Sequence, residues 1–394
     1  MDNRVKIVHI TPAAMSLEVL LKDRFARLSD LGYESIGYSG SDQYSGSFRS
    51  SGFEFIESRH LTRRSGLLSD LKFFMECIRV LRSKRPSIVN TYGPKPGLYG
   101  RIASKLAGIP VTVHTSWGFF YEDDAPLLKR LPIVILEVIL SFFCDHIFSE
   151  NMDDLMVLRK WGIGEKKASY LGNGTDVNNM FDPDKYSEVY VQNLKEELGI
   201  KGDAIVISMI GRLTAQKGYR EFFYAADHFG RADGKYEFVV IGPMDSTKGD
   251  GITEEEIASL ERNGTIRYLG SRDHSEMPGL LSLADIVVLP SYREGFPRSL
   301  IEAASMGKPL VASRIRGCRE AVDDGYNGIL VPAKDPEALV DAIGDLLRNP
   351  GKRERLATAS REKAINEFDE VDVVSRMDEI YRRLLANRSR RSGT

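Results

Sequence analysis

The chain has 394 residues, which is long for one compact domain and predicts two domains of ordinary size. Hydrophobic residues make up 42%, charged residues 28%, and the formal net charge is −2, which argues against a disordered chain and a globally basic nucleic-acid binder. The three cysteines, Cys77, Cys144 and Cys318, form no C-x-x-C pair. Neither a disulfide framework nor a zinc site is expected, and a reducing compartment suits this usage.

The beginning of the chain leads almost directly into an apolar strand pattern and lacks the apolar core of a secretory signal. The most apolar run, Leu131 to Phe148, is short for a membrane span and contains Glu137, Asp145 and His146. A core helix that runs into a strand explains this segment better. We therefore expect a soluble, cytoplasmic protein.

In the first half, short β-branched runs alternate with amphipathic stretches. In chain order we expect a strand at 5–10, a helix at 16–31, a strand at 34–39, a helix at 66–84, a strand at 87–92, a helix at 96–108 and a strand at 110–116. Alternation at this spacing predicts a parallel sheet with helices on both faces. The loop after the first strand, TPAAMS, contains no glycine, so the dinucleotide fingerprint is absent and an NAD-dependent dehydrogenase is not expected.

A polar passage rich in Asp, Pro and Tyr, 177–190, is typical of a linker. After it the alternation restarts, with expected elements at 204–211, from about 219, 236–242, 253–262, 265–270, 284–291, 309–313 and 327–332. The sequence thus predicts an α/β fold of two doubly wound, Rossmann-like domains. Ligands of such sheets bind beyond the carboxyl ends of the strands, so the loops there are the candidate sites.

One such loop, SYREGFPRSLIEAASMG, follows the buried-strand pattern at 284–291. Glu294 lies in the loop, Pro297 fits the first helical position, and Glu302 falls in the early turns of the helix. Between the two carboxylates, backbone N–H groups at the start of the helix form an anion site: those of Gly295, Phe296, Arg298 and Ser299. With a phosphate held there, the carboxylates of Glu294 and Glu302 could accept hydrogen bonds from sugar hydroxyls. Alternatively, one glutamate caps the helix and the other is solvated.

Two further loops carry polar residues at strand ends. Gly211 ends a strand, and Arg212 and Lys217 follow it in the turn before the next helix, where two cations suit a diphosphate. His114 ends the strand at 110–116, and its titration near neutrality would make it a hydrogen-bond donor to a leaving phosphate or a sugar hydroxyl. Alternatively, Arg212 and Lys217 are ordinary surface charges, and His114 has only a structural role.

In this order and spacing, G-R-x4-K-G at 211–218 and E-G-F-P-x4-E at 294–302 resemble the retaining family 4 glycosyltransferases of GT-B fold. The segments PKPGLYGRIASKLAGIPVTVHT, LGNGTD and GCREAVDDGYNGILVP are similar to that family's acceptor domain, interdomain segment and C-terminal motif. The resemblance implies two Rossmann-like domains that face a central cleft. Residues 1–176 would bind the acceptor, 177–370 would bind the nucleotide sugar, and 371–394 would form a helix that returns to the first domain, with a basic tail.

The resemblance also implies roles for single residues. Arg212 and Lys217 would bind the diphosphate of the sugar donor, Glu294 would hold its sugar hydroxyls, and Glu302 would accept from the ribose. The implied catalytic set is His114, Arg212, Lys217 and Glu294. The implied donor-binding set is Gly211, Arg212, Lys217, Arg272, Glu294, Gly295, Phe296, Pro297, Arg298, Ser299 and Glu302, with Arg272 at the base pocket.

The implied reaction is a same-face displacement in which the departing phosphate helps to deprotonate the acceptor. The positively charged side chains of Arg212 and Lys217 would stabilise the leaving group. No cofactor and no metal are expected, because no D-x-D motif lies near either strand-end group, and EDD at 122–124 has the character of loop charge. The nucleotide is expected to be UDP on the frequency of UDP in the family.

The sequence departs from the family where relatives carry a second histidine, here Trp117, and where they carry a glycine pair, here Ala13 and Ala14. The acceptor set is accordingly weak: Ala13, Ala14, Arg63, Lys95 and Trp117. The resemblance is to enzymes that extend polyprenyl-diphosphate-linked sugars for bacterial capsules, O-antigens or glycoproteins.

Basic clusters at 59–65, 127–130 and 381–394 are either solvated surface or a site for anionic lipid on the inner face of the cell membrane. The second alternative predicts liposome binding that weakens with salt. Two other functions stay open: an isomerase such as a UDP-GlcNAc 2-epimerase, which shares GT-B architecture, and a regulator that binds nucleotide sugars without turnover.

Overall fold

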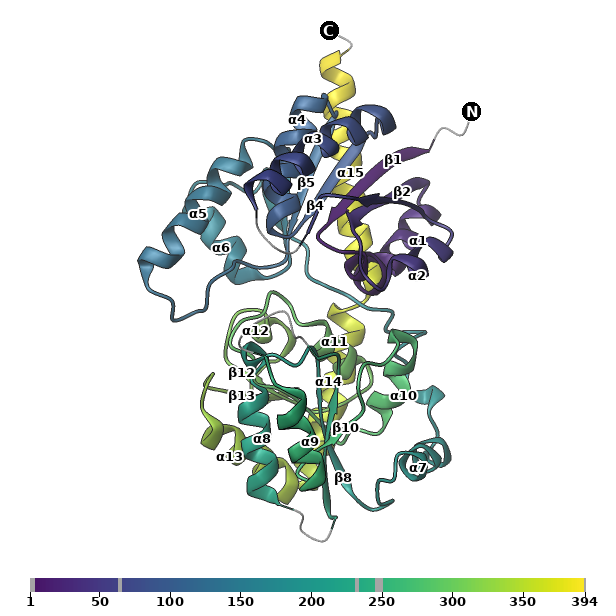
Figure 1. Ribbon diagram of the computed structural model, residues 1–394, viewed down its shortest axis with the longest axis vertical. Coiled ribbons are helices and arrows are strands. Elements are labelled where there is room, and N and C mark those ends of the chain that lie inside the picture. Colours follow the sequence, from purple (N-terminus) through teal and green to yellow (C-terminus); the bar gives the residue numbers. More distant parts are fainter. Residues whose placement is uncertain (1–3, 63–65, 231–233, 245–250, 393–394) are drawn as a thin grey trace. The chain divides into compact units, whose positions relative to one another are not determined.

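The computed structural model describes residues 4–62, 66–230, 234–244 and 251–392 (Figure 1). The chain divides into two compact units. The first comprises Met1–Asn173 together with Glu370–Thr394, and the second comprises Gly174–Asp369.

The first unit is built on a seven-stranded parallel sheet in the order β3-β2-β1-β4-β5-β6-β7. Its strands are β1 Val5–Thr11, β2 Tyr33–Gly40, β3 Glu54–Ser58, β4 Ile88–Tyr92, β5 Val111–Ser116, β6 His146–Ser149 and β7 Ala168–Tyr170. The strand order reverses between β1 and β4. At such a switch point the loops diverge to opposite faces and leave a crevice at the carboxyl edge, which the loops after β1 and β4 border.

The helices of the first unit connect these strands. They are η1 Ser16–Leu21, α1 Lys22–Asp30, α2 Ser45–Ser50, α3 Leu67–Lys84, η2 Pro96–Gly100, α4 Arg101–Ala107, α5 Leu127–Ser141, α6 Met152–Lys160 and α15 Glu370–Ser392. Figure 1 shows α15, in yellow, beside the strands of this unit although it ends the chain. Val373, Met377 and Tyr381 of α15 are buried against residues of β1, β4 and β5. A fully buried ion pair between Arg24 and Glu370 joins α15 to α1.

The second unit has a six-stranded parallel sheet in the order β10-β9-β8-β11-β12-β13. Its strands are β8 Ile205–Ile210, β9 Tyr236–Ile241, β10 Arg267–Tyr268, β11 Ile286–Leu289, β12 Leu310–Ser313 and β13 Gly328–Val331. Its helices are η3 Pro183–Lys185, α7 Glu188–Glu197, η4 Ala215–Lys217, α8 Tyr219–Phe229, α9 Glu254–Arg262, η5 His274–Glu276, α10 Met277–Ser282, α11 Arg298–Ser305, α12 Cys318–Ala321, α13 Pro336–Arg348 and α14 Pro350–Glu367. The switch point lies between β8 and β11.

The expectation of two doubly wound parallel sheets is confirmed. The expectation of a linker at 177–190 is wrong, because Val177 and Phe181 are fully buried in the core of the second unit. The polar composition of this passage concealed two apolar anchors.

The apolar run at 131–148 does form a helix and a strand, α5 and β6. Helix α5 is nevertheless only partly a core helix, since Leu128 and Ile139 are 86% and 51% exposed, and Phe142 directly after it is 74% exposed. None of the helices in the described part of the chain combines the length and apolarity needed to cross a bilayer.

Candidate active site

The switch point of the second unit brings two of the sequence-predicted loops together. Parallel strands β8 and β11 are neighbours, so the loops that leave their carboxyl ends start side by side. The β8 loop carries Gly211, Arg212 and Lys217, and the β11 loop carries Ser291 and Glu294. The backbone N–H of Tyr292 donates to the carbonyl of Gln216 at 2.9 Å, which ties the two loops to each other.

The centre of this site is an ion pair between Lys217 and Glu294. Lys217 Nζ lies 2.7 Å from Glu294 Oε1, and Ser291 Oγ donates to the same oxygen at 2.6 Å. Both charged side chains are largely buried, with 22% and 12% of the side chain exposed. An ammonium has three N–H donors and a carboxylate about four acceptor positions, so this pair uses only part of their hydrogen-bonding capacity. Charge-assisted bonds at a half-buried position hold both groups in one orientation.

Two glycines allow the loops to pack this closely. A Cβ on Gly218 would lie 2.1 Å from the carbonyl oxygen of Pro290, and a Cβ on Gly317 would lie 2.3 Å from that of Gly295. Both glycines also adopt positive φ, +80° and +75°. The loop after β12, which contains Gly317, therefore supports the backbone that follows Glu294.

A second polar group surrounds Glu302 on α11. Glu302 is 5% exposed, and its Oε1 accepts from Arg298 Nε at 3.0 Å and contacts His274 Nε2 at 2.7 Å. Burial disfavours its ionised form, but His274 and Arg298 outweigh this and hold the pKa of Glu302 below its usual value. Glu302 is therefore a fixed carboxylate. Neither His274 nor Ser291 is among the site residues predicted from the sequence.

The remaining residues of the predicted donor set lie around these groups. Pro297 directly precedes α11 as its N-cap instead of occupying its first turn, and Ser299 lies in that first turn. Phe296 is buried, and its ring packs edge-on against Phe368 at 5.7 Å between centroids. Arg272 is part of the η5 loop, where its Nε donates to the carbonyl of Leu269.

The first unit contains a cavity of about 380 Å³ at the carboxyl edge of its sheet. It is lined by three of the predicted residues, His114, Lys95 and Trp117, together with side chains from α3, η2, α4 and α5. Lys95 Nζ lies 2.8 Å from Asp70 Oδ1 and donates to the carbonyl of Thr62 at 2.9 Å. Ala13 and Ala14 are buried and do not line this cavity, and Arg63 lies outside the described residues.

His114 is fixed in one protonation state and one tautomer. It is 4% exposed, and its Nδ1 lies 3.0 Å from the carbonyl oxygen of Thr91. Burial, assisted by Arg101, lowers the pKa of His114 to about 3. The expectation that it titrates near neutrality is therefore wrong. Nδ1 also lies 2.9 Å from Thr91 Oγ1, which can donate its own proton to the carbonyl of Val113 at 3.4 Å. A proton on Nδ1 of the neutral ring then satisfies both the hydroxyl and the carbonyl of Thr91, and this tautomer leaves Nε2 able to accept a hydrogen bond.

Arg101 and Glu137 form a two-pronged ion pair next to His114. Arg101 is 1% exposed, and its Nη1 and Nη2 donate to the carboxylate of Glu137 at 2.6 and 2.9 Å. Arg101 also donates to the carbonyl of Gly97, whose missing side chain leaves room for the His114 ring. This pair joins α4 to α5 and forms part of the cavity wall.

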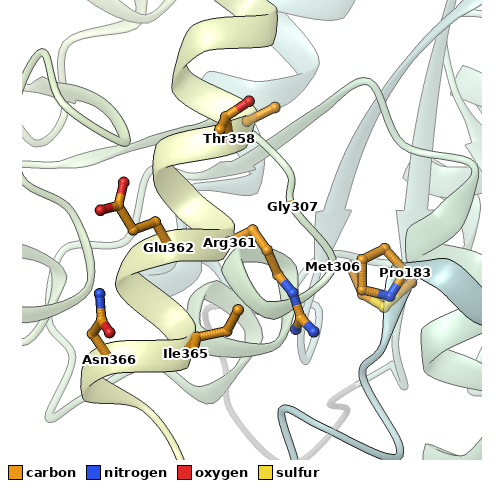
Figure 2. A pocket seen from close by; sticks show the side chains of 9 residues that line it. Pro183, Met306, Gly307, Thr358, Arg361, Glu362, Ile365 and Asn366 are labelled. Carbon is orange, nitrogen blue, oxygen red and sulfur yellow. The ribbon is translucent and has the colours of Figure 1, made fainter.

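A larger cavity of the second unit, about 660 Å³, lies against α14, and none of the predicted residues lines it (Figure 2). The lining includes Pro183, Met306 and Arg361. Arg361 donates to three backbone carbonyls, those of Val177, Phe181 and Ser305. Its guanidinium thus stabilises the surrounding backbone, and the cavity gathers none of the predicted site groups.

Within the described residues, no cluster of three or more His, Cys, Asp or Glu side chains is arranged to hold a metal ion. Cationic side chains at the two sites include Lys217 and Arg298 in the second unit and Lys95 and Arg101 in the first, and Arg212 belongs to the β8 loop.

Two Rossmann-like units, each with polar side chains at the carboxyl edge of its sheet, define a two-domain α/β protein of the kind that binds ligands at those edges. Residues 191–363 match the family model described as glycosyl transferases group 1, and residues 39–151 match the one described as glycosyl transferase 4-like. The chain belongs to these glycosyltransferases, and its fold is GT-B.

Individual relatives cover most of the chain. An Escherichia coli protein named UDP-Gal:alpha-D-GlcNAc-diphosphoundecaprenol alpha-1,3-galactosyltransferase is 28% identical over 340 residues, 83% of each chain. The Campylobacter jejuni N,N'-diacetylbacillosaminyl-diphospho-undecaprenol alpha-1,3-N-acetylgalactosaminyltransferase is 29% identical over 88% of this chain and 90% of its own. The structure of Anabaena Alr3699/HepE in complex with UDP and glucose has a TM-score of 0.78, with 20% identity over 95% of this chain and 99% of that one.

Proposed function

We propose that the protein is a retaining glycosyltransferase that moves a hexose or N-acetylhexosamine from a UDP-sugar to a polyprenyl-diphosphate-linked glycan in bacterial surface polysaccharide assembly. The observation that carries this proposal is the Lys217–Glu294 pair, 2.7 Å apart, at the switch point of the second sheet. A fixed ammonium suits a diphosphate, and an adjacent carboxylate suits sugar hydroxyls. The relatives from E. coli and C. jejuni, whose names specify diphosphoundecaprenol-linked acceptors, support the proposed substrate class.

The sugar donor would lie across the two loops of the second unit. Arg212 and Lys217 neutralise the diphosphate, and the backbone N–H groups of Gly295 and Phe296 contact the sugar or phosphate. The helix start at Pro297, Arg298 and Ser299 adds a favourable dipole for the anion. Gly211 leaves room in the β8 loop, Glu302 accepts from the ribose hydroxyls, and Arg272 lies by the base.

The acceptor would enter the cavity of the first unit, where Lys95 and Trp117 contact it. Transfer proceeds on one face of the sugar, so the anomeric configuration is retained. The departing phosphate takes the proton of the acceptor hydroxyl, while Lys217 and Arg212 stabilise the negative charge that develops on the leaving group. Neutral His114 accepts a hydrogen bond at Nε2 from a sugar hydroxyl and does not itself transfer the proton.

These cations allow the leaving group to be neutralised without a metal ion, so we propose that the reaction is metal-independent and uses no cofactor. We also propose that the protein works on the cytoplasmic face of the membrane and contacts it peripherally, since a polyprenyl chain keeps the acceptor in the bilayer.

A transfer assay tests the proposal. The protein is incubated with UDP-Gal, UDP-Glc, UDP-GlcNAc or UDP-GalNAc and a prenyl-diphosphate-GlcNAc acceptor, and free UDP and extended lipid are measured with and without EDTA. We expect both products, with EDTA having no effect. Lys217→Ala should lower kcat/KM by about 100- to 1000-fold, as loss of one charge-stabilising donor does elsewhere, and Glu294→Gln should also lower it.

Arg220→Ala provides the matched control, because Arg220 is an exposed cation three residues after Lys217, in the first turn of α8. Its turnover should equal that of wild type. Wild-type turnover from the Lys217→Ala/Glu294→Gln double variant would refute the site. An epimerised nucleotide sugar without free UDP would instead establish the isomerase alternative.

A further inference from the structure

Helix α5 of the first unit carries a continuous line of exposed apolar side chains. Its six exposed large apolar residues range from 39% to 86% exposed, and Phe142, which follows the helix, is 74% exposed. The six are Leu127, Leu128, Leu131, Ile135, Leu136 and Ile139. Positions 128, 131, 135, 139 and 142 are three or four residues apart, which places them in one stripe along the helix. The stripe is about 21 Å long at 1.5 Å per residue.

This face differs from that of an ordinary surface helix. The opposite side of α5 packs on the core through buried Val134 and Leu140, so the helix is apolar on both sides. A helix that is hydrophobic all round is normally covered all round, and a contiguous exposed apolar patch marks a membrane or protein contact. We call the exposed stripe of Leu128, Leu131, Ile135, Ile139 and Phe142 the α5 face.

Helix α5 carries the α5 face on one side and, on an adjacent side, residues that line the cavity containing His114. Ile133 and Leu136 of α5 line that cavity, as does Phe120, which is 54% exposed. Helix α3 lies at another part of the rim, since Asp70 in its first turn also lines the cavity. The neighbouring residues of α3 are exposed apolar side chains too, namely Leu67, Leu68, Leu71 and Met75. The opening of the cavity is thus bordered by hydrocarbon on two helices.

The scarcity of charged residues on α5 indicates that lipid, and not another protein, contacts this face. The charged residues of α5 are Lys129, Arg130 and Glu137, and Glu137 is bound to Arg101 at the cavity wall. The stripe therefore offers hydrocarbon without donors or acceptors over most of its length, whereas protein interfaces carry about one hydrogen bond per 100–200 Å². Lys129 lies at one end, in the position where a cation flanks a buried apolar face at a bilayer surface, whereas the Arg130 guanidinium lies over the ring of buried Tyr121, 5.1 Å from its centroid.

From this geometry we propose that the α5 face, together with the exposed leucines of α3, inserts into the hydrocarbon edge of a lipid bilayer. The cavity would then open toward the membrane, in which a prenyl-linked acceptor is held. This inference rests on the proposed function only for the role of the cavity. It deepens that function by naming the surface through which the enzyme meets its acceptor.

The proposal makes a prediction about salt that differs from docking by basic clusters. Lys129 and Arg130 are offset by Asp123 and Asp124, which precede the helix, so apolar insertion should dominate. The wild-type protein should float with phosphatidylcholine vesicles, with or without 25% phosphatidylglycerol, and should do so in 0.1 and 0.5 M NaCl. Binding that requires the anionic lipid and disappears in 0.5 M NaCl would assign the contact to the basic clusters and overturn the proposal.

Substitutions on the α5 face test it directly. Ile135→Gln/Ile139→Gln should weaken partitioning into either vesicle at least tenfold. The matched control, Val189→Gln/Ile365→Gln, changes two exposed apolar residues of the second unit, 68% and 46% exposed, and should bind as wild type does. Far-ultraviolet circular dichroism melts establish that both variants fold. Wild-type partitioning by the α5 variant would refute the proposal.

Sedimentation velocity tests the alternative that a second copy of the chain, and not lipid, binds the α5 face. A wild-type dimer that becomes a monomer in Ile135→Gln/Ile139→Gln, with vesicle binding unchanged, would show that the α5 face joins two copies. Vesicle binding does not depend on transfer, so its failure is distinct from failure of the proposed function. Conversely, the α5 variant should keep wild-type kcat on a short-chain, water-soluble acceptor, which a merely unfolded protein would not.

Discussion

His114 illustrates how burial sets the role of a single side chain. Its ring lies among Thr91, Gly97 and Arg101, and its pKa of about 3 keeps it neutral at any pH where the protein works. The carbonyl and the hydroxyl of Thr91 both lie at Nδ1 and together favour a proton on that nitrogen. The ring therefore serves as a hydrogen-bond acceptor with a fixed direction, and proton transfer in the reaction falls to the departing phosphate.

We expect His114→Ala to lower kcat/KM by about 10- to 100-fold, the equivalent of one hydrogen bond to a polar substrate group, ~1.5–3 kcal/mol. His114→Gln should recover part of this loss, because its amide oxygen can accept where Nε2 does. Steady-state kinetics between pH 5.5 and 8 measure both effects. An activity limb near pH 6.5 in wild type that disappears in His114→Gln would contradict the neutral role.

The residues of the candidate site differ in how far sequence could predict them. Lys217 and Glu294 were expected in one site because both follow strands, and adjacent parallel strands bring their loops together. His274 was missed, since the capping box of Asp273 and Glu276 indicates where the 3-10 turn after β10 begins but does not indicate that the turn brings His274 to Glu302 on α11. The protonation of His114 could not be predicted either, because it follows from burial by distant segments.

At the scale of elements, three loops at the carboxyl edge of the second sheet support one another. Gly218 lets the β8 loop approach Pro290, and Gly317 lets the β12 loop approach Gly295. The position of Glu294 thus depends on the loop that follows β12, a strand two places away from β8 in the sheet. Loop backbones in such contact move together, so a change in the β12 loop should be felt at the ion pair.

Gly317→Ala should weaken UDP binding at least tenfold and lower the melting temperature, because its Cβ would lie 2.3 Å from the carbonyl oxygen of Gly295. Gly325→Ala is the matched control: it has a similar φ, +80°, but no atom within 4 Å of the added Cβ. Both variants carry the strain of a non-glycine residue at positive φ, about 1 kcal/mol. Calorimetric titration with UDP should show the loss of affinity in Gly317→Ala alone, and equal losses would refute the loop coupling.

Whether a segment forms a helix or a strand was easier to predict than which of its side chains become buried. The switch from apolar periodicity to a strand pattern in 131–148 identified α5 and β6 correctly. Composition could not show that Leu128 and Phe142 stay exposed, since an apolar residue faces core or solvent only once its neighbours are placed. The same reason explains why Val177 and Phe181 were assigned to a linker.

On the scale of the whole molecule, the buried histidines concentrate in one unit. Burial lowers the pKa of His9 to about 3, of His114 to about 3 and of His146 to about 4. All three belong to the first unit. In the unfolded chain they titrate near 6.5, so below this pH the unfolded state binds protons that the folded state does not.

The free energy of unfolding of the first unit should therefore fall as the pH drops below about 6.5, by up to about 1.4 kcal/mol per pH unit for each histidine. Urea denaturation at pH 7.5, 6.5, 5.8 and 5.0 measures this slope, and the second unit should be less affected in the same range. His146→Gln should reduce the slope by about one third. A free energy that stays level from pH 6.5 to 5.0 would contradict the assignment.

The return of α15 has a consequence for biosynthesis. Val373, Met377 and Tyr381 complete a core whose other side is formed by strands from the beginning of the chain, and Glu370 neutralises the buried Arg24. On the ribosome the first sheet emerges early but lacks this helix until α15 has been translated, after the whole second unit. The segment made second, Gly174–Asp369, is contiguous and can fold while translation continues. The half that is synthesised first is thus the half that matures last.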